Sequence, residues 1–379
     1  MNRKTLYKVI GCIFILLLIL PCFGILREKR NIELIAEMEN RSINSKPVAK
    51  ILTGKFFKEF ESWYDDRLLG RKDLIRLWSS INGKLFNVLI SKEVALGKDG
   101  YLFFPFNLSQ ELVDTKEKMD LLIKINDLCK KDNIRFTIFI TPPSEWILPE
   151  LLPEKYKPAN IEVIEAETGK MLREVNIDYC FIANKMLEES LKERQSMYYA
   201  GDNHWNKKGG YYGARELLKH LGFDKKINSD VFYNQEIGFG DIYTKKIGWE
   251  TIKSIVDVPW SNNFDNDIKE ESHIAGEVIN GAVSGAAQKG ELIYVNNNAS
   301  NKIKVLILGD SFYYAMSRYL LQDISTIILS HNCDMATPKN VIDVSKMIEK
   351  YQPDVVVYEK VGCNFYGHGY DAVFDNYKI

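Results

Sequence analysis

Two short polar segments of this 379-residue chain contain the side-chain types that nucleophilic catalysis needs. In the later segment, KVLILGDSFYY at residues 304–314, an apolar strand-like run leads into Gly309-Asp310-Ser311, and a helical pattern follows. Ligands of open α/β sheets bind where the strands end, and the first N–H groups of a helix can stabilise an oxyanion. The pattern therefore favours Ser311 as a nucleophile at the start of a helix. Because Ser and Asp are also common helix caps, capping is the alternative interpretation.

The earlier segment, YYAGDNHWNKKGG at residues 198–210, places Asp202 two positions before His204. Such residues project to the same side of an extended loop. An imidazole that accepts a serine proton needs a carboxylate to fix its tautomer and to stabilise the imidazolium, and this spacing supplies both groups. A metal needs a third ligand, and none is suitably spaced, so we predict no metal and no cofactor. Of the other histidines, His220 falls near a predicted helix end, where the helix dipole explains it simply.

Alternating helix and strand patterns, which begin after a turn signal at residues 97–100, must position these segments. Strands are expected at 134–141, 177–182, 304–308, 326–330 and 354–361. Helices are expected at 116–131, 161–175, 208–221, 312–322 and 341–351. This alternation indicates a mainly parallel α/β sheet covered on both faces. Loops at the carboxyl edge of such a sheet share one cleft, so Asp202, His204 and Ser311 are expected to converge.

Between residues 225 and 301 the alternation breaks. Eight asparagines and the small-residue stretch GAVSGAAQKG fall in the later part of this region, and helical and strand patterns are faint. We predict an irregular insertion within a main domain at 96–379. The insertion either lines a substrate groove or is a surface elaboration.

The N-terminus has the pattern of a membrane anchor. Residues 9–26 lack any charge and, as a helix, would span about 27 Å, close to the thickness of a hydrocarbon core. The run ends without the small residues of a cleavage site, so we predict an uncleaved, single-pass signal anchor at 1–27. Basic residues lean slightly toward an N-terminus inside the cell, which places the rest outside the cytoplasm.

Residues 28–95 are predicted to form a membrane-proximal helical region. Its aromatic residues recur at three-to-four spacing, as at Phe56, Phe60 and Tyr64. This face is either a docking surface for a membrane or partner, or a set of helices packed on the main domain.

The composition excludes several classes of protein. The chain is 46% hydrophobic and 27% charged, which is typical of a folded globular protein rather than a disordered one. Its 50 basic and 51 acidic residues give a net charge of -1, so no nucleic-acid partner is predicted. The six cysteines include no C-x-x-C pair, which leaves zinc and thioredoxin-like redox sites without support.

Together, the two polar segments resemble the SGNH hydrolase-like domains of the alginate O-acetyltransferase family and of the Gram-positive proteins named for an Asp-His-His-Trp motif. Asp202-Asn203-His204-Trp205 matches that motif at all but its second position, and Gly309-Asp310-Ser311 matches the serine block. The Asp-His pair precedes the serine by about a hundred residues, as in the permuted acetyltransferase branch. Further similarities lie at 63–67, 94–103 and 141–143, so the resemblance covers most of the chain outside the insertion. It implies an SGNH-hydrolase-like (flavodoxin-like) sheet with permuted motif order.

The resemblance also implies a role for each site residue. Ser311 would attack an acyl donor, His204 would act as general base and Asp202 would orient His204. The N–H of Ser311 would form part of the oxyanion hole. Asn364 follows the last strand as in the G-x-N block of ordinary SGNH enzymes, which implies either a second oxyanion donor or a turn-forming residue.

Three aromatic residues near these loops, Trp205, Tyr199 and Tyr314, are candidates for stacking on a sugar, although core packing accounts for some such aromatics. The resemblance implies a membrane-anchored, extracytoplasmic O-acetyltransferase that acts on a cell-surface or secreted polysaccharide. The acetyl donor would be supplied by a multi-pass membrane-bound O-acyltransferase. A carbohydrate acetylesterase with the same triad and a non-catalytic polysaccharide-binding scaffold are the alternatives.

Overall fold

The computed structural model describes residues 3–19, 23, 45–48, 54–82, 94–108, 115–264, 267–274, 277–281, 290–331, 342–366 and 377–379. The chain divides into two compact units, one of residues 1–94 with 242–251 and one of residues 95–241 with 252–379. The second unit contains both polar segments.

A mixed sheet forms the centre of the second unit, with the strand order β4-β3-β13-β10-β11-β9-β7-β8. The first five strands are parallel: β4 (Asp178–Phe181), β3 (Arg135–Thr141), β13 (Val355–Val361), β10 (Asn301–Gly309) and β11 (Ile324–His331). Every residue of β13 is buried, as expected for a strand covered on both faces. The predicted α/β class with a parallel core is confirmed, and the antiparallel edge is an addition to it.

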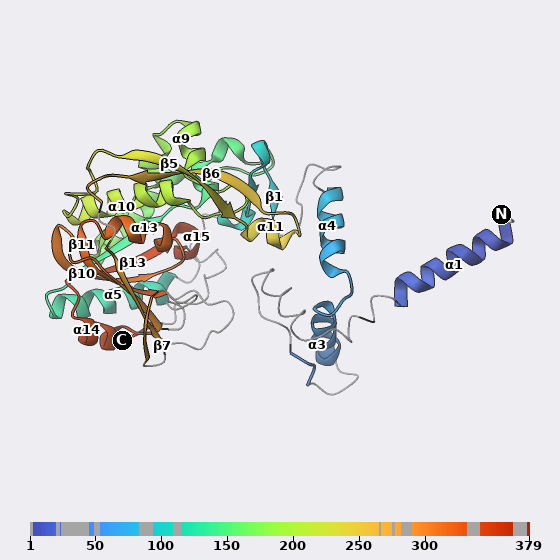
Figure 1. Cartoon of the computed structure of the whole chain (residues 1–379). Helices are drawn as coiled ribbons and strands as arrows, with labels where there is room; N and C mark the ends of the chain where they lie inside the picture. The colour runs from blue at the N-terminus through green and yellow to red at the C-terminus, as the bar shows by residue number, and fades with distance from the viewer. Residues whose placement is uncertain are drawn as a thin grey trace. The chain divides into compact units, whose positions relative to one another are not determined.

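Helices cover both faces of this sheet. Figure 1 shows α10 (Lys207–Leu221) and α13 (Tyr313–Leu320) on one face, and α5 (Thr115–Lys131) and α14 (Val344–Tyr351) on the other. Helix α10 approaches α13 closely because Gly210 has no side chain: a Cβ atom there would lie 2.4 Å from the carbonyl oxygen of Ala315. The remaining helical segments of this unit are η3 (Lys98–Gly100), η4 (Pro105–Leu108), α6 (Ser144–Ile147), η5 (Pro149–Leu151), α7 (Ile161–Glu174), α8 (Ala183–Leu187), α9 (Leu191–Ser196) and α15 (Gly362–Phe365).

The region at 225–301 is more regular than its sequence pattern predicts. Strands β5 (Phe232–Gly240) and β6 (Ile252–Trp260) form an antiparallel hairpin. Strands β9 (Gly290–Val295), β7 (Lys269–Ile274) and β8 (Glu277–Asn280) extend the main sheet beyond β11. The prediction of an irregular insertion was wrong for these segments. Most residues of β5 and all of β8 are exposed, so the apolar and polar alternation that marks a half-buried strand is absent.

Two short pairs complete the described strands. Strands β1 (Ala95–Leu96) and β2 (Leu102–Phe103) are antiparallel, and β12 (Ile342–Asp343) and β14 (Tyr377–Lys378) are parallel. The turn predicted at residues 97–100 joins β1 to β2, and Gly100 adopts a φ of 77° there.

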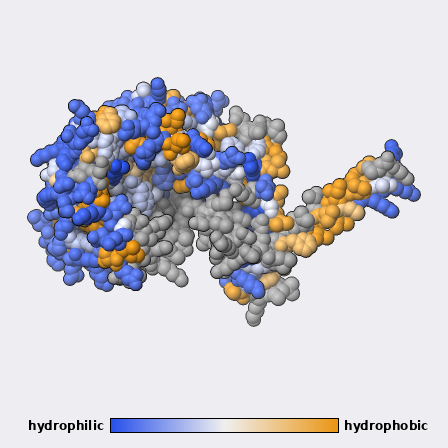
Figure 2. Space-filling view, viewed as in Figure 1, coloured by the Kyte–Doolittle hydropathy of each residue, from blue (hydrophilic) through white to orange (hydrophobic). Residues whose placement is uncertain are grey.

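The N-terminal unit contains α1 (Arg3–Ile19), α3 (Gly54–Asp65) and α4 (Arg71–Ile81), with α11 (Ile242–Lys246) from its second segment. Figure 2 shows α1 covered largely by apolar residues. Among the residues that the structure describes, no helix is long and apolar enough to cross a membrane, so the span predicted at 9–26 is not found. Residues 20–22 and 24–26 of that span lie outside the described residues, as does most of the weak helix expected after residue 82.

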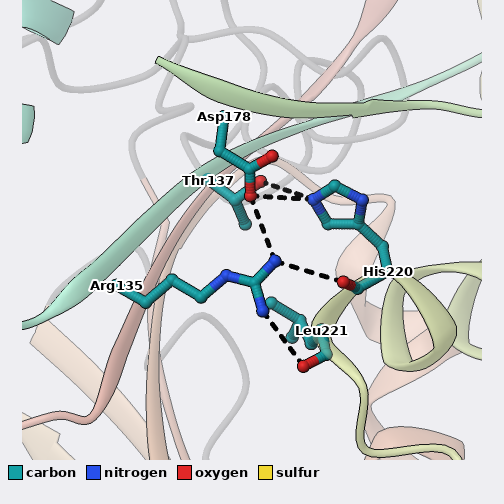
Figure 3. Close-up of polar contacts among 5 residues, drawn as sticks. All are labelled: Arg135, Thr137, Asp178, His220 and Leu221. Carbon is teal, nitrogen blue, oxygen red and sulfur yellow. Dashed lines mark hydrogen bonds and ion pairs between the residues drawn. The ribbon is translucent and has the colours of Figure 1, made fainter. Parts of the chain in front are cut away.

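A polar cluster fastens the end of α10 to the starts of β3 and β4 (Figure 3). The Nε2 atom of His220 lies 2.9 Å from Asp178 Oδ2 and 3.2 Å from Thr137 Oγ1. Arg135 donates to Asp178 Oδ2 at 3.2 Å, and to the carbonyl oxygens of His220 and Leu221 at 3.1 and 3.0 Å. The guanidinium thereby satisfies carbonyls that the end of a helix leaves unpaired. Because α10 begins within the earlier polar segment, this cluster helps to fix where that segment lies.

Candidate active site

The loop that contains Asp202 and His204 is held at the N-terminus of α10. Asn206 caps the helix, since its side-chain oxygen accepts the N–H groups of Lys208 and Gly209 at 2.9 and 3.3 Å. The N–H of Asn206 donates to the carbonyl oxygen of Met197 at 2.8 Å, which closes the loop at its base. The loop is therefore tied at both ends to regular structure.

His204 lies between Asp202 and Ser311. Its Nδ1 atom is 2.7 Å from Asp202 Oδ1, and its Nε2 atom is 2.5 Å from Ser311 Oγ. The backbone N–H of His204 also donates to Asp202 Oδ1, at 3.1 Å. The side chains of Asp202 and His204 are 8% and 20% exposed. With Nδ1–H donated to the carboxylate, Nε2 can accept the hydroxyl proton of the serine, so the group can activate Ser311 as a nucleophile.

Ser311 lies in the turn between β10 and α13, not at the first position of the helix as the sequence predicts. Helix α13 begins at Tyr313, is preceded by Phe312, and has no side-chain cap. The reason is Asp310, whose Oδ1 accepts the N–H of Phe312 at 3.1 Å and so holds the chain in a tight turn before the helix. The capping interpretation of Ser311 is wrong, because its hydroxyl contacts His204 and not the helix end.

Trp205 links the two polar segments through buried contacts. Its side chain is only 2% exposed, its indole N–H donates to the carbonyl oxygen of Phe312 at 2.9 Å, and its ring packs on Phe312 and beside Gly209 and Gly213. A buried indole has no face left for a sugar, so the predicted substrate-binding role of Trp205 is wrong. The residue instead connects residues 198–206, here called the base loop, to residues 309–312, here called the serine turn.

The other two aromatic candidates differ in their surroundings. Tyr199 is half-buried against β5, where a Cβ atom on Gly238 or Gly240 would overlap its side chain. Tyr314 is 42% exposed, and its ring packs against that of Tyr313 with centroids 4.4 Å apart and the planes tilted by 50°. A sugar-stacking role for either residue stays a prediction, and Tyr314 offers the more accessible ring.

Asn364 is drawn toward the serine turn. Its Nδ2 donates to Asp310 Oδ2 at 3.2 Å, and the same oxygen accepts the N–H of Val361 at 2.8 Å. The amide of Asn364 thus helps to hold Asp310, and its predicted role as an oxyanion donor stays untested.

A further polar residue, Glu359, lies under the turn and was missed in the sequence. It is fully buried in β13, where Oε2 accepts the N–H of Asp310 at 3.0 Å and Oε1 accepts the hydroxyl of Thr141 at 3.1 Å. Burial, reinforced by the Asp310 carboxylate, raises the pKa of Glu359 well above its ordinary value. The signal that could have found it is the pair of charged residues, Glu359 and Lys360, within an otherwise apolar strand, VVVYEKV.

The end of β3 supports the base loop from the other side. The hydroxyl of Tyr198 donates to the carbonyl oxygen of Pro142 at 2.8 Å, and the N–H of Ser144 donates to that of Asn203 at 3.3 Å. The described part of the chain holds no group of three or more His, Cys, Asp or Glu side chains placed to bind a metal ion. Three of the described cysteines, Cys129, Cys180 and Cys363, are buried.

The arrangement of Asp202 and His204 has a superficial counterpart at the opposite ends of the strands. In the cluster of Figure 3, however, Asp178 and Thr137 both contact Nε2 of His220. A proton relay needs the carboxylate and the hydroxyl on opposite ring nitrogens, so this cluster is a structural clamp.

Comparisons with known proteins concern the fold and the family of this chain. A family model described as "SGNH hydrolase-like domain, acetyltransferase AlgX" matches residues 94–231, which include Asp202 and His204 and end before Ser311. Two proteins named "Probable alginate O-acetylase AlgJ" are 24% identical, that of Pseudomonas putida over 187 residues and that of Pseudomonas syringae over 172. These matches cover 48% and 44% of this chain and 47% and 43% of the relatives, so the chain spans about half the length of the curated relatives it matches.

Among solved structures, PatB1 of Bacillus cereus with a sulfonyl adduct superposes with a TM-score of 0.54 at 16% identity, over 72% of this chain and 95% of that one. PatB1 without the adduct gives a TM-score of 0.51, over 70% and 95% of the two chains. At this identity the likeness shows the fold, which is SGNH-like.

Proposed function

Because residues 94–231 match the SGNH hydrolase-like acetyltransferase family model and the chain is similar to alginate O-acetylases, we propose that it transfers acetyl groups to hydroxyls of a cell-surface or secreted polysaccharide. The observation that carries the proposal is the placement of His204, 2.7 Å from Asp202 and 2.5 Å from Ser311. That geometry is what acyl transfer through a serine requires.

In the first half of the reaction, Ser311 Oγ attacks the acetyl carbonyl carbon of the donor while His204 Nε2 takes the hydroxyl proton. The carbonyl oxygen becomes an oxyanion, and the N–H of Ser311 is the donor that we assign to it. The bond to the leaving group then breaks, and the leaving group departs with the proton from His204. The products are acetyl-Ser311 and neutral His204.

In the second half, a sugar hydroxyl gives its proton to His204 Nε2, and its oxygen attacks the acetyl carbon. Collapse of the second tetrahedral intermediate breaks the bond to Ser311 Oγ, which regains its proton from His204. Asp202 keeps the imidazole oriented and stabilises its positive charge in both halves. If water replaces the sugar, the same steps make the protein a carbohydrate acetylesterase, so the acceptor decides between the two activities.

The site of action is proposed to be outside the cytoplasm, with residues 9–26 anchoring the chain in the lipid bilayer and a multi-pass membrane-bound O-acyltransferase supplying acetyl groups. The support is the uncharged run in the sequence, which has no credible cleavage site. Protease treatment of intact spheroplasts should digest the larger unit, and full protection would reverse this topology.

The chemistry is tested with Ser311→Ala, using 4-nitrophenyl acetate as the acetyl donor and a panel of polysaccharide oligomers as acceptors. Turnover should fall on the order of 10³-fold or more, because no acetyl-enzyme can form. The matched control is Ser317→Ala, which removes a buried hydroxyl from α13 that bonds only the Tyr313 carbonyl oxygen. This control should lose about 1 kcal/mol of stability and keep its turnover.

Two outcomes would count against the proposal. Turnover close to that of the unmodified chain in Ser311→Ala would remove the nucleophile and favour a polysaccharide-binding scaffold. Acetate release that no acceptor oligomer diverts into O-acetyl sugar would favour the esterase.

A further inference from the structure

The carboxyl group of Glu359 connects the ends of three neighbouring strands. Glu359 belongs to β13, Thr141 is the last residue of β3, and Asp310 directly follows β10. The two carboxyl oxygens accept one hydrogen bond from each side, from the Thr141 hydroxyl at 3.1 Å and from the Asp310 N–H at 3.0 Å. All three residues are fully buried. The side chain of Glu359 therefore links the start of the serine turn to the ends of β3 and β13.

The shape of the turn is fitted to this carboxyl group. A Cβ atom on Gly309 would lie 2.7 Å from Glu359 Oε2, so the glycine leaves the space that the carboxyl oxygen fills. Asp310, the next residue, turns its own carboxylate away to accept the N–H groups of Phe312 and Val361. Ser311 follows at once, and its Oγ lies 2.5 Å from His204. Any movement of Gly309-Asp310 must therefore change the position of the nucleophile.

Four described residues determine the electrostatic surroundings of Glu359. Asp310 faces it from the serine turn, Tyr313 from α13 and Thr141 from β3, and Lys360 follows it on β13. Burial and then the Asp310 charge raise the pKa of Glu359, and this outweighs the lowering by the Asp310 N–H, Lys360 and Thr141. Both effects disfavour the ionised form of this carboxyl group, which lies beside the carboxylate of Asp310.

We propose that Glu359 is a positioning residue, which holds the Gly309-Asp310-Ser311 turn so that the serine oxygen faces His204. The inference rests on the proposed function, since it assigns Glu359 a role in positioning the proposed nucleophile, Ser311. Glu359 acts through Asp310 and contacts neither the acetyl donor nor the sugar acceptor. Its loss should therefore lower kcat and leave KM unchanged, because a nucleophile that is displaced by a fraction of an ångström loses alignment rather than substrate binding.

Three variants of the full chain separate positioning from plain stability. Glu359→Gln keeps an oxygen for the Asp310 N–H and offers an amide to the Thr141 hydroxyl, so it should keep kcat within about threefold. Glu359→Leu keeps the volume and leaves the Asp310 N–H without its acceptor, and its kcat should fall at least tenfold at unchanged KM. Thr141→Val removes one hydroxyl, and its kcat should fall between the other two. Thr168→Val is the matched control, at a buried threonine on α7 whose hydroxyl bonds the Ile164 carbonyl oxygen and contacts the Tyr366 hydroxyl.

The readouts are kcat and KM for 4-nitrophenyl acetate, the melting temperature, and the rate at which phenylmethanesulfonyl fluoride labels Ser311, followed by mass spectrometry. Slow labelling and low kcat in Glu359→Leu and Thr141→Val, with recovery in Glu359→Gln, would support the inference. If Glu359→Leu fails to fold, Thr141→Val and Glu359→Gln decide it by the same measures. Unchanged kcat and labelling in Thr141→Val and Glu359→Leu, or equal loss in Glu359→Gln and Glu359→Leu, would overturn it. Turnover that survives Ser311→Ala would instead overturn the proposed function, because that result does not involve Glu359.

Discussion

Replacing Asp178 with Asn should make the larger unit less stable at neutral pH and should remove part of its sensitivity to acid. Asp178 lies at the start of β4, where it accepts from Arg135 and contacts His220 at the end of α10 (Figure 3). The substitution keeps the shape of the side chain and removes its charge. It therefore tests how much the ionised carboxylate contributes to holding α10 in place.

The magnitude follows from the pKa of this carboxyl group. Partial burial by itself raises the pKa of Asp178, but the hydrogen bond and charge of His220, and then those of Arg135, outweigh it and lower the pKa from 3.8 to about 2. That difference corresponds to roughly 2.4 kcal/mol at about 1.36 kcal/mol per pKa unit. The side chain is 41% exposed, so solvent screens the interaction, and we expect about 1 kcal/mol.

The sign sets the pH range. Between pH 3.8 and about 2 the unfolded chain binds the proton and the folded chain does not, so the stability from Asp178 falls as the pH falls through this range. At pH 5 and above it is fully present. Asp178→Asn should thus be about 1 kcal/mol less stable than the unmodified chain from pH 5 to 7, and the difference should shrink below pH 4.

Urea unfolding followed by tryptophan fluorescence, repeated from pH 3 to pH 7, measures this difference. Asp120→Asn, at an exposed position on α5, is the matched control and should show no difference at any pH. A stability loss in Asp178→Asn that is the same at pH 3 and pH 7 would refute the reasoning, because the charge would then play no part.

Three further predictions concern the active site. Asp202→Asn should lower kcat by on the order of 10³-fold or more with little change in the melting temperature, since the imidazole loses the partner that fixes its tautomer; a change below tenfold in kcat would contradict this. Gly240→Ala should cost about 1–3 kcal/mol of stability and lower kcat at least tenfold, because its Cβ would lie 2.2 Å from Tyr199 Cβ and 2.9 Å from Asp202 Cβ. Gly54→Ala, where a Cβ meets nothing within 4 Å, is its control, and equal behaviour of the two in calorimetry and kinetics would argue against crowding. Trp205→Phe should cost about 1–3 kcal/mol by thermal unfolding, because the buried carbonyl of Phe312 loses its donor; an unchanged melting temperature would show that another group replaces it.

The parallel core could be predicted from the sequence because its strands are buried on both faces. Strands such as β10 and β13 appear as unbroken apolar runs, and their observed ends differ from the predicted ones by only a few residues. The exposed strands β5 and β8 give no such contrast, and pairing with their neighbours determines them instead.

The candidate site was predictable in part for a related reason. Ser311 follows a strand, so its place at the sheet edge can be inferred, whereas Asp202 and His204 follow α9 and required the motif to link them with the serine. Glu359 was missed because a charged residue in a strand normally marks an exposed position. The structure shows that Gly309 packs against the Glu359 carboxyl group and leaves room for it. Trp205 was misassigned because an aromatic residue beside a site serves a ligand or the core equally well in sequence terms.

The position of β13 in the sheet has a consequence for the timing of activity during biosynthesis. This strand is the last of the five parallel strands in chain order, yet it lies between β3 and β10. A growing chain exposes the base loop first and the serine about a hundred residues later, while the gap between β3 and β10 is still empty. Glu359, which holds the serine turn, and the strand that sets the distance between β3 and β10 are both absent until residues 355–361 have been made. Domains begin to fold during synthesis, at about 5–20 residues per second, so for several seconds the nascent chain contains Ser311 and His204 but lacks the strand that lies between β3 and β10. The arrangement of the active site described above is therefore complete only when β13 has joined the sheet.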